Sequence, residues 1–184
     1  LPDSGGNGGG TMSNVHLDDD STPSSNPKGT GNRDNTSTVL TPVATGVEVY
    51  GCDVVSIDCS NSSEGYFIAN YTGANQKVKM QVTGPNQITY TYNLHGGEEV
   101  FPLPAESGTY NITVFESTDI ANNKYSTAFS TAISANITNT FGPYLYPSQY
   151  VNFTADSLAV VKAAELAKPA NNALEVVTFV YNYV

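Results

Sequence analysis

Apolar and polar residues alternate along most of the chain between positions 47 and 140, which is the pattern of strands with one buried and one exposed face. The clearest pair is QKVKMQV at 76–82 and ITYTYNL at 88–94, because the GPNQ between them is turn-forming. We therefore expect a β-hairpin here. The residues expected to face its core are Val78, Met80, Val82, Ile88, Tyr90, Tyr92 and Leu94.

Five further runs have the composition of strands: DVVSIDC, EGYFIANYTG, EEVFPLP, GTYNITVFE and KYSTAFSTAISANIT. In the last run, Tyr125, Phe129, Ile133 and Ile137 are expected on one side. Each sheet then has one solvent-exposed face and one apolar face, so two sheets must bury their apolar faces together. The pattern predicts a mainly β fold, an antiparallel β-sandwich of immunoglobulin or fibronectin type with about seven strands, over residues 47–140.

A connector at 141–153 interrupts the alternation with Tyr and Pro residues and has no period of its own. Its aromatic residues allow two interpretations. They pack against the neighbouring elements, which we favour because the residues around them are apolar or Pro. Alternatively, they form a platform on which sugar rings stack. The residues concerned are Tyr144, Tyr146, Tyr150 and Phe153.

Residues 154–184 change to spacings of three and four, which predicts two helices. Thr154 or Asp156 caps the first helix, which runs to about Ala167 before Pro169. The second starts near Asn172, and Glu175 three residues later forms an arrangement like a capping box.

The second helix carries an apolar stripe through Leu174, Val177 and Tyr181 that needs a partner. We expect this stripe to pack on the sandwich or on a second copy of the chain. A third possibility is that its partner is a core domain that would follow Val184.

Residues 1–46 consist mostly of Gly, Ser, Thr, Asn, Asp and Pro, and all of the 12 Tyr and 7 Phe lie at or after Tyr50. A segment with so little apolar surface predicts a disordered tether.

The formal net charge of −10 and the scattered basic residues argue against nucleic acid as a partner. No run approaches the ~20 apolar residues of a membrane span. Acidity and a polar leader favour an exported, extracellular or cell-surface protein.

The only two cysteines, Cys52 and Cys59, are seven positions apart. A disulfide between them requires a turn, because a continuous strand would place them about 23 Å apart. The alternative is two buried free thiols.

Neither cysteine has the setting of a nucleophile, and His95 lies in a turn, NLHGGEE. The sequence contains no complete catalytic constellation and implies no cofactor or metal.

The order of six segments resembles that in the amino-terminal region of bacterial transglutaminase-like surface or secreted proteins. The segments are EGYFIANYTG, QKVKMQVTGPNQITYTYNL, EEVFPLP, GTYNITVFE, YLYPSQYVNFTADSLAV and LEVVTFVYNYV. The resemblance covers roughly Glu64 to Val184. It implies a β-sandwich before a papain-like core whose first helix is similar to 172–184. The catalytic cysteine, histidine and aspartate of that family would lie beyond Val184, so the resemblance assigns none of them here.

These expectations favour a non-catalytic accessory or spacer domain of an exported transglutaminase-like protein, from a Gram-positive bacterium, cut near the start of its core. Its expected partners are that core domain and, through the C-terminal helix, a second copy of the chain. The alternative function is a cell-surface adhesin or carbohydrate-binding module.

Overall fold

The computed structural model describes residues 39–104 and 106–184, so most of the expected tether lies outside the described residues. The strands are β1 (Val49–Gly51), β2 (Val55–Asp58), β3 (Tyr66–Tyr71), β4 (Val78–Thr83), β5 (Thr89–Leu94), β6 (Gly97–Pro102), β7 (Gly108–Asp119) and β8 (Lys124–Ala135). The helices are α1 (Leu158–Ala167) and α2 (Ala173–Tyr183), with short 3₁₀ helices at Ser62–Glu64 and Gly142–Tyr144.

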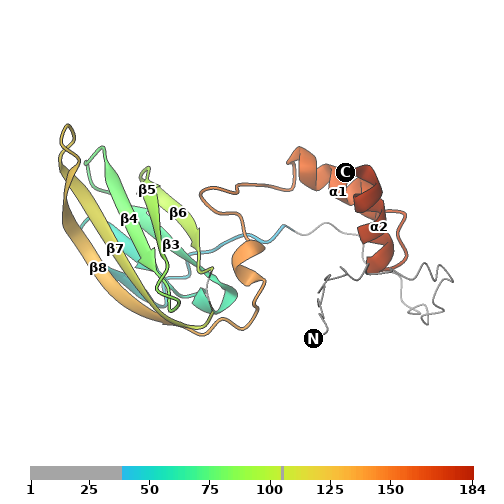
Figure 1. Ribbon diagram of the computed structural model, residues 1–184, viewed down its shortest axis with the longest axis horizontal. Coiled ribbons are helices and arrows are strands. Elements are labelled where there is room, and N and C mark those ends of the chain that lie inside the picture. Colours follow the sequence, from blue (N-terminus) through green and yellow to red (C-terminus); the bar gives the residue numbers. More distant parts are fainter. Residues whose placement is uncertain (1–38, 105) are drawn as a thin grey trace, which may run out of the picture.

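Two antiparallel sheets of four strands each pack face to face (Figure 1). One has the order β1-β2-β3-β6 and the other β5-β4-β7-β8. The expectation of a mainly β fold followed by two helices is confirmed. The seven expected runs all contain strands, and the described residues add an eighth, the three-residue edge strand β1.

The core lies between the sheets and follows the alternation of the sequence. Phe67 and Phe101 from one sheet meet Met80 and Ile112 from the other, and all four are fully buried. The Phe67 and Phe101 rings stack with centroids 5.5 Å apart, and Tyr92 meets Phe101 edge-on at 4.8 Å. Such aromatic pairs add stabilisation beyond the apolar area that they bury.

Two residues expected in the core lie at its rim. Ile88 is 50% exposed and Tyr90 is 38% exposed, whereas Tyr92 and Leu94 further along the same strand are buried. Ile88 belongs to the turn after β4, and Tyr90 lies at the beginning of β5, the edge strand of its sheet. Alternation with a period of two predicts which side of a strand each residue faces. It does not predict which of the inward-facing residues the opposite sheet covers.

Tyr125 is on the opposite side from the one that we expected. Val114 pairs with Phe129 but Phe115 pairs with Thr127, so β8 has an extra residue at this point. Such a bulge moves the residues beyond it to the other face. Tyr125 therefore lies on the outer face, with its ring 4.6 Å from the Lys79 ammonium.

Residues close in sequence to each helix form the hydrogen bonds at its N-terminus. Ser157, not Thr154 or Asp156, is the N-cap of α1, and its hydroxyl accepts a hydrogen bond from the Thr154 amide at 2.9 Å. At α2 the Asn172 side chain accepts from the Glu175 amide at 2.9 Å, and the Glu175 carboxylate accepts from the Asn171 amide at 2.7 Å. These reciprocal bonds satisfy amides that have no partner within the helix.

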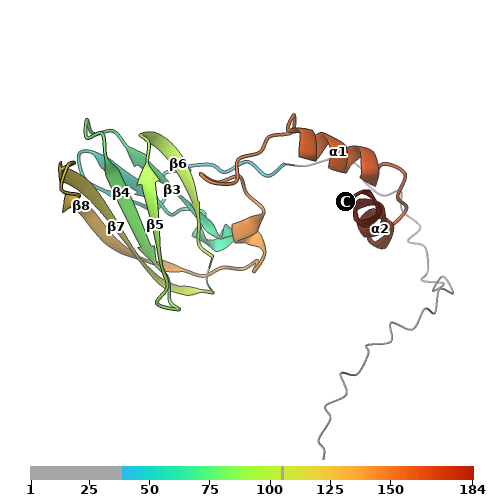
Figure 2. The same ribbon diagram turned by 45° about the horizontal axis from the view of Figure 1, so that its top comes forward.

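The helices pack on each other beyond the end of the sandwich, as Figures 1 and 2 show from two directions. Lys162 of α1 lies 4.8 Å above the Tyr183 ring of α2. The expected stripe is open to solvent, with Leu174 73%, Val177 62% and Tyr181 81% exposed. Burial of this stripe against the sandwich, one of our expectations, is therefore wrong, while pairing with a second copy remains a prediction.

Truncating Phe101 tests the shared core. Phe101→Ala should lower the free energy of unfolding by about 3–5 kcal/mol, because it leaves a cavity between the sheets. Ile120→Ala, in the exposed β7–β8 turn, should change it by less than about 0.5 kcal/mol. Urea titrations give both values, and equal effects of the two substitutions would contradict the described core.

Candidate functional site

The connector closes the side of the sandwich where the edge strands β5 and β6 meet. The Gln149 amide donates to the Val100 carbonyl at 3.0 Å, which extends the edge of β6 by one backbone hydrogen bond. One residue on, the Tyr150 ring stacks on Tyr92 of β5 with centroids 5.8 Å apart. The connector thus contacts the edges of both sheets.

Close backbone approach fixes the first part of the connector. A Cβ at Gly142 would lie 2.2 Å from the Glu64 carbonyl oxygen. A Cβ at Gly65, which has φ of 89°, would lie 2.4 Å from the Pro143 ring. Both positions therefore require glycine. Tyr146 follows, with its ring centroid 4.5 Å from that of Tyr66.

The Gln149 side chain joins three segments that are distant in sequence. Its amide nitrogen donates to the Asn93 carbonyl of β5 and to Oε2 of Glu99 on β6, both at 2.6 Å. The Glu99 Oε1 atom accepts from the His95 backbone amide at 2.7 Å, and Oε2 lies 3.1 Å from His95 Nδ1. Gln149 Nε2 also lies 3.3 Å from His95 Nδ1, so this ring atom donates to Glu99 in one tautomer and accepts from Gln149 in the other. Within the described residues Gln149 Oε1 is buried without a partner.

Residues 39–46 run beside the connector and are anchored to the sandwich. The Gly46 amide donates to the Asp58 carboxylate at 2.7 Å, and the Asn61 side chain donates to the Val43 carbonyl at 2.7 Å. The Val43 amide lies 3.2 Å from the Tyr66 hydroxyl, which accepts its hydrogen. The last part of the predicted tether is therefore held against the fold.

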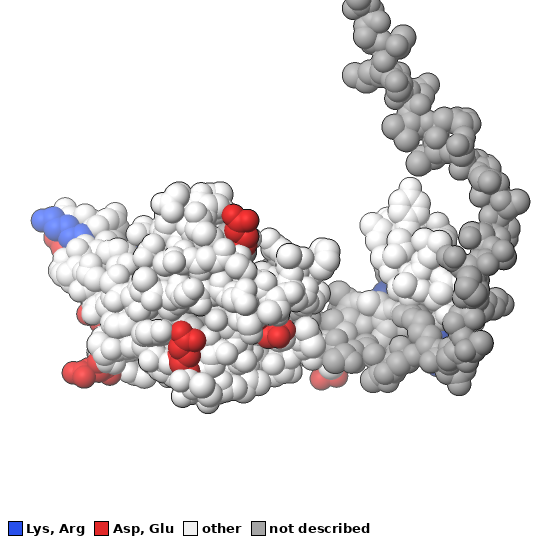
Figure 3. All heavy atoms as spheres, turned by 90° about the horizontal axis from the view of Figure 1, so that it is seen from below, with Lys and Arg blue, Asp and Glu red and all other residues white. Residues whose placement is uncertain are grey.

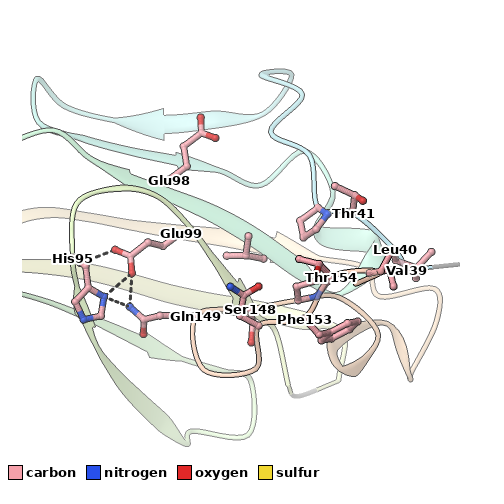
Figure 4. Close-up of a pocket in the computed structure, with 15 residues that line it drawn as sticks. Val39, Leu40, Thr41, His95, Glu98, Glu99, Ser148, Gln149, Phe153 and Thr154 are labelled. Atoms are coloured by element: carbon pink, nitrogen blue, oxygen red, sulfur yellow. Dashed lines mark hydrogen bonds and ion pairs between the residues drawn. The ribbon is translucent and has the colours of Figure 1, made fainter. Parts of the chain in front are cut away.

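A groove of about 840 Å³ lies between this anchored segment, β6 and the connector (Figure 4). Its walls are residues 39–42 and 147–149 with 152–155, and its floor includes Glu98 to Val100. Figure 4 shows the His95, Glu99 and Gln149 cluster at one end and Leu40 with Phe153 at the other. The groove is therefore polar at one end and apolar at the other.

The charged residues of the sandwich are unevenly placed. None of the described residues that line the groove is Lys or Arg, and its lining includes Glu98, Glu99 and His95. In Figure 4 the Glu98 carboxylate points away from Glu99. In Figure 3 the blue basic atoms on the sandwich gather at the end away from the helices, and red carboxylates are spread over the visible surface. Lys77 belongs to the basic end, because its ammonium donates to Asn123 in the β7–β8 turn at 2.6 Å.

The four candidate aromatic residues of the connector do not form one platform. Tyr146 packs on β3, Tyr150 packs on β5, and the hydroxyl of Tyr144 donates to the Pro104 carbonyl at 3.3 Å. Only Phe153 lines the groove. Sequence reasoning missed Gln149, Glu98 and Glu99, and took His95 for an isolated turn residue. No motif marks Gln149, because its three partners come together only in the folded chain.

Both cysteines are free. A turn does form between them, since the Cys52 amide donates to the Val55 carbonyl, but the Cys59 amide donates to Glu48 at the far end of the β1–β2 hairpin. The two residues are thus about 13 Å apart along β2, beyond the reach of a disulfide. The expected alternative of two buried thiols is also only half right, because Cys59 is buried and Cys52 is exposed.

Burial raises the pKa of the Cys59 thiol to about 12, with smaller contributions from the charges of Glu48 and Asp58. The thiol therefore stays protonated near neutral pH.

Among the residues that the structure describes, no cluster of His, Cys, Asp or Glu is arranged to hold a metal ion. The helices described are too short or too polar for any of them to cross a membrane.

Comparison of the chain with protein-family models, with curated proteins and with solved structures finds no match.

Thiol labelling tests the two cysteine environments. In the native protein near pH 8, a disulfide reagent should modify one thiol per chain rapidly, because only Cys52 is exposed and thiolate is the reactive form. Guanidinium chloride should release the second thiol. Cys52→Ser should abolish the rapid native reaction, and rapid labelling that persists in this variant would contradict the burial of Cys59.

Removing the Gln149 side chain tests closure of the sandwich. Gln149→Ala should lower the free energy of unfolding by about 2 kcal/mol, because it removes a hydrogen bond to a charged carboxylate and leaves Glu99 short of a donor. The matched control is Gln76→Ala, at an exposed position with no hydrogen bond of its side chain among the described contacts. Equal stabilities of the two variants in urea would contradict the role given to Gln149.

Proposed function

We propose that residues 47–153 act as a non-catalytic accessory or spacer domain of an exported transglutaminase-like protein, and that α1 and α2 are the first helices of its papain-like core. One observation carries the proposal. The sandwich buries its own core, whereas α2 exposes an apolar stripe through Leu174, Val177 and Tyr181. Helices with such a stripe gain most of their stability from a packing partner.

The sandwich is proposed to be of the immunoglobulin or fibronectin type. Strands β4 and β5 form a hairpin, the chain crosses to β6 in the other sheet, and it returns to β7 beside β4. The resulting orders, β2-β3-β6 and β5-β4-β7-β8, correspond to strands A-B-E and C′-C-F-G of that class. On this assignment, β1 is an addition at the edge.

The arrangement of the thiols and the ring of His95 supports a non-catalytic role. A thiolate nucleophile needs a lowered pKa and a neighbouring base. Cys59 has a raised pKa, and Cys52 lies near β8, with its sulfur 3.9 Å from the Ala128 carbonyl oxygen. His95 lies at the opposite edge of the sandwich, beside β6. Neither cysteine therefore has this imidazole as a base.

The acidic composition is in keeping with the proposed extracellular or cell-surface location, and a Gram-positive bacterium is the source that the family resemblance implies. A formal net charge of −10 favours solubility and disfavours adhesion to anionic polymers. In such a protein, the sandwich would space the core from its attachment point and hold it through the connector.

An amide-transfer assay tests the proposal. With a glutamine-bearing protein and a fluorescent primary amine, the 184-residue chain should show no incorporation above the uncatalysed rate, since neither thiol is activated. Cys59→Ser and Cys52→Ser should match the parent chain. Incorporation that either substitution abolishes would contradict a non-catalytic domain.

A further inference from the structure

We propose that β8 pairs antiparallel with β8 of a second copy of the chain, with Ala132 on the twofold axis. The sheets of order β5-β4-β7-β8 from the two copies then join into one continuous sheet. This interaction surface is separate from the helices, and it does not depend on the transglutaminase-like resemblance.

The two sides of the sandwich differ in how their edge strands are covered. On one side, the connector contacts β5 through Tyr150 and β6 through Gln149. On the other side, the edges are β1, with three residues, and β8, with twelve. Among the described residues β8 pairs only with β7, and Figure 1 shows β8 along the outer border of its sheet. A long edge strand without cover is a template for another strand.

The hydrogen bond of Ile137 shows which backbone groups of β8 point outward. Its amide donates to the Ser107 hydroxyl, just before β7, at 2.8 Å. Successive residues of an antiparallel strand direct their backbone groups to opposite sides. The N–H and C=O groups of Ser130, Ala132 and Ser134 therefore point away from β7, and the side chains of these three residues are exposed.

The bulge in β8 marks where the uncovered part of the strand begins. The extra residue is Ala128, and the Cys52 sulfur from the β1–β2 turn lies 3.9 Å from its carbonyl oxygen. The uncovered part of β8 is therefore Phe129 to Ala135, which is long enough for a typical pair of strands. We call this part the β8 edge.

A second copy is the partner that the composition of the β8 edge favours. Residues from Tyr125 to Ala135 include no charged side chain, although the chain has a formal net charge of −10. Two acidic molecules repel each other, and this repulsion is weakest where they meet through an uncharged strand. The small outward residues Ser130, Ala132 and Ser134 form no pocket that would select the side chains of a different protein.

The β8 edge is centred on Ala132, which sets the register of the proposed pair. Ser130 then lies opposite Ser134 of the second copy, and these residues can exchange two backbone hydrogen bonds. The half-buried Phe129 lies opposite the small Ala135, so the inward-facing side chains do not clash. The two Lys124 residues are then about 50 Å apart along the strands, so the basic ends of the copies stay separate.

Sedimentation equilibrium of the 184-residue chain tests the proposal. Between about 10 and 500 µM, the average mass should rise reversibly from that of one chain, 19.5 kDa, toward twice that value, because a single strand edge makes a small, transient interface. A mass that stays at one chain throughout this range would overturn the proposal.

Proline substitutions show which edge is used. Ala132→Pro removes an N–H that points away from β7, a position where edge strands tolerate proline, and should abolish the rise in mass. The matched control is Thr91→Pro on β5. The Asn93 carbonyl accepts from Gln149 outside the sheet, so the Thr91 N–H two residues earlier also points outward. Thr91→Pro should leave the rise unchanged, and equal effects of the two substitutions would overturn the proposal.

Two further variants separate the β8 edge from the apolar stripe of α2. Tyr181→Asp should leave the rise in mass unchanged, and dissociation by this substitution would overturn the proposal in favour of a helix-mediated dimer. Ala132→Cys in a Cys52→Ser background should form a disulfide between two chains on oxidation, because paired residues across the axis have Cα atoms about 5.5 Å apart. Thr91→Cys in the same background should not, and equal cross-linking of the two would also overturn the proposal. The cross-link needs no proline, so it decides the matter if Ala132→Pro fails to fold.

Discussion

Closure of the sandwich along β5 and β6 by the Gln149 side chain is the contact on which the rest of the arrangement depends. The two strands are edges of different sheets, and the turn at His95 and Gly96 joins them. The side-chain amide of Gln149 donates to the Asn93 carbonyl of β5 and to the Glu99 carboxylate of β6. An exposed edge is a template for unwanted pairing, and a covering segment is a common way to protect it.

That closure directs the chain beyond it. With Gln149 fixed, Tyr150 stacks on Tyr92 and Phe153 enters the groove beside Leu40. The groove exists because two segments, 39–42 and 147–155, flank the same part of β6. The helices then lie beyond the last contacts of the connector with the sandwich, which leaves the apolar stripe of α2 exposed (Figure 2). The proposal of an accessory role rests on this exposed stripe.

The sequence predicts what depends on local pattern. Alternation identified the buried face of β4 at Val78, Met80 and Val82, and the Asn172 and Glu175 spacing identified the cap of α2. It could not predict the bulge that turns Tyr125 outward, because one extra residue in β8 leaves the composition of the strand unchanged. The groove was equally hidden, since Gln149 meets Asn93 and Glu99 across about fifty positions of chain.

Hydrogen exchange of the whole chain measures most directly whether sandwich and connector form one unit that excludes the helices. The central β3 amides and the Gln149 amide, which donates to Val100, should exchange only through global unfolding. Amides of α2 between Val176 and Tyr183 should exchange at least about a hundredfold faster, through local opening of a hairpin with no buried face. Protection of α2 equal to that of β3 would contradict the account, because it would show that the helices share the core of the sandwich.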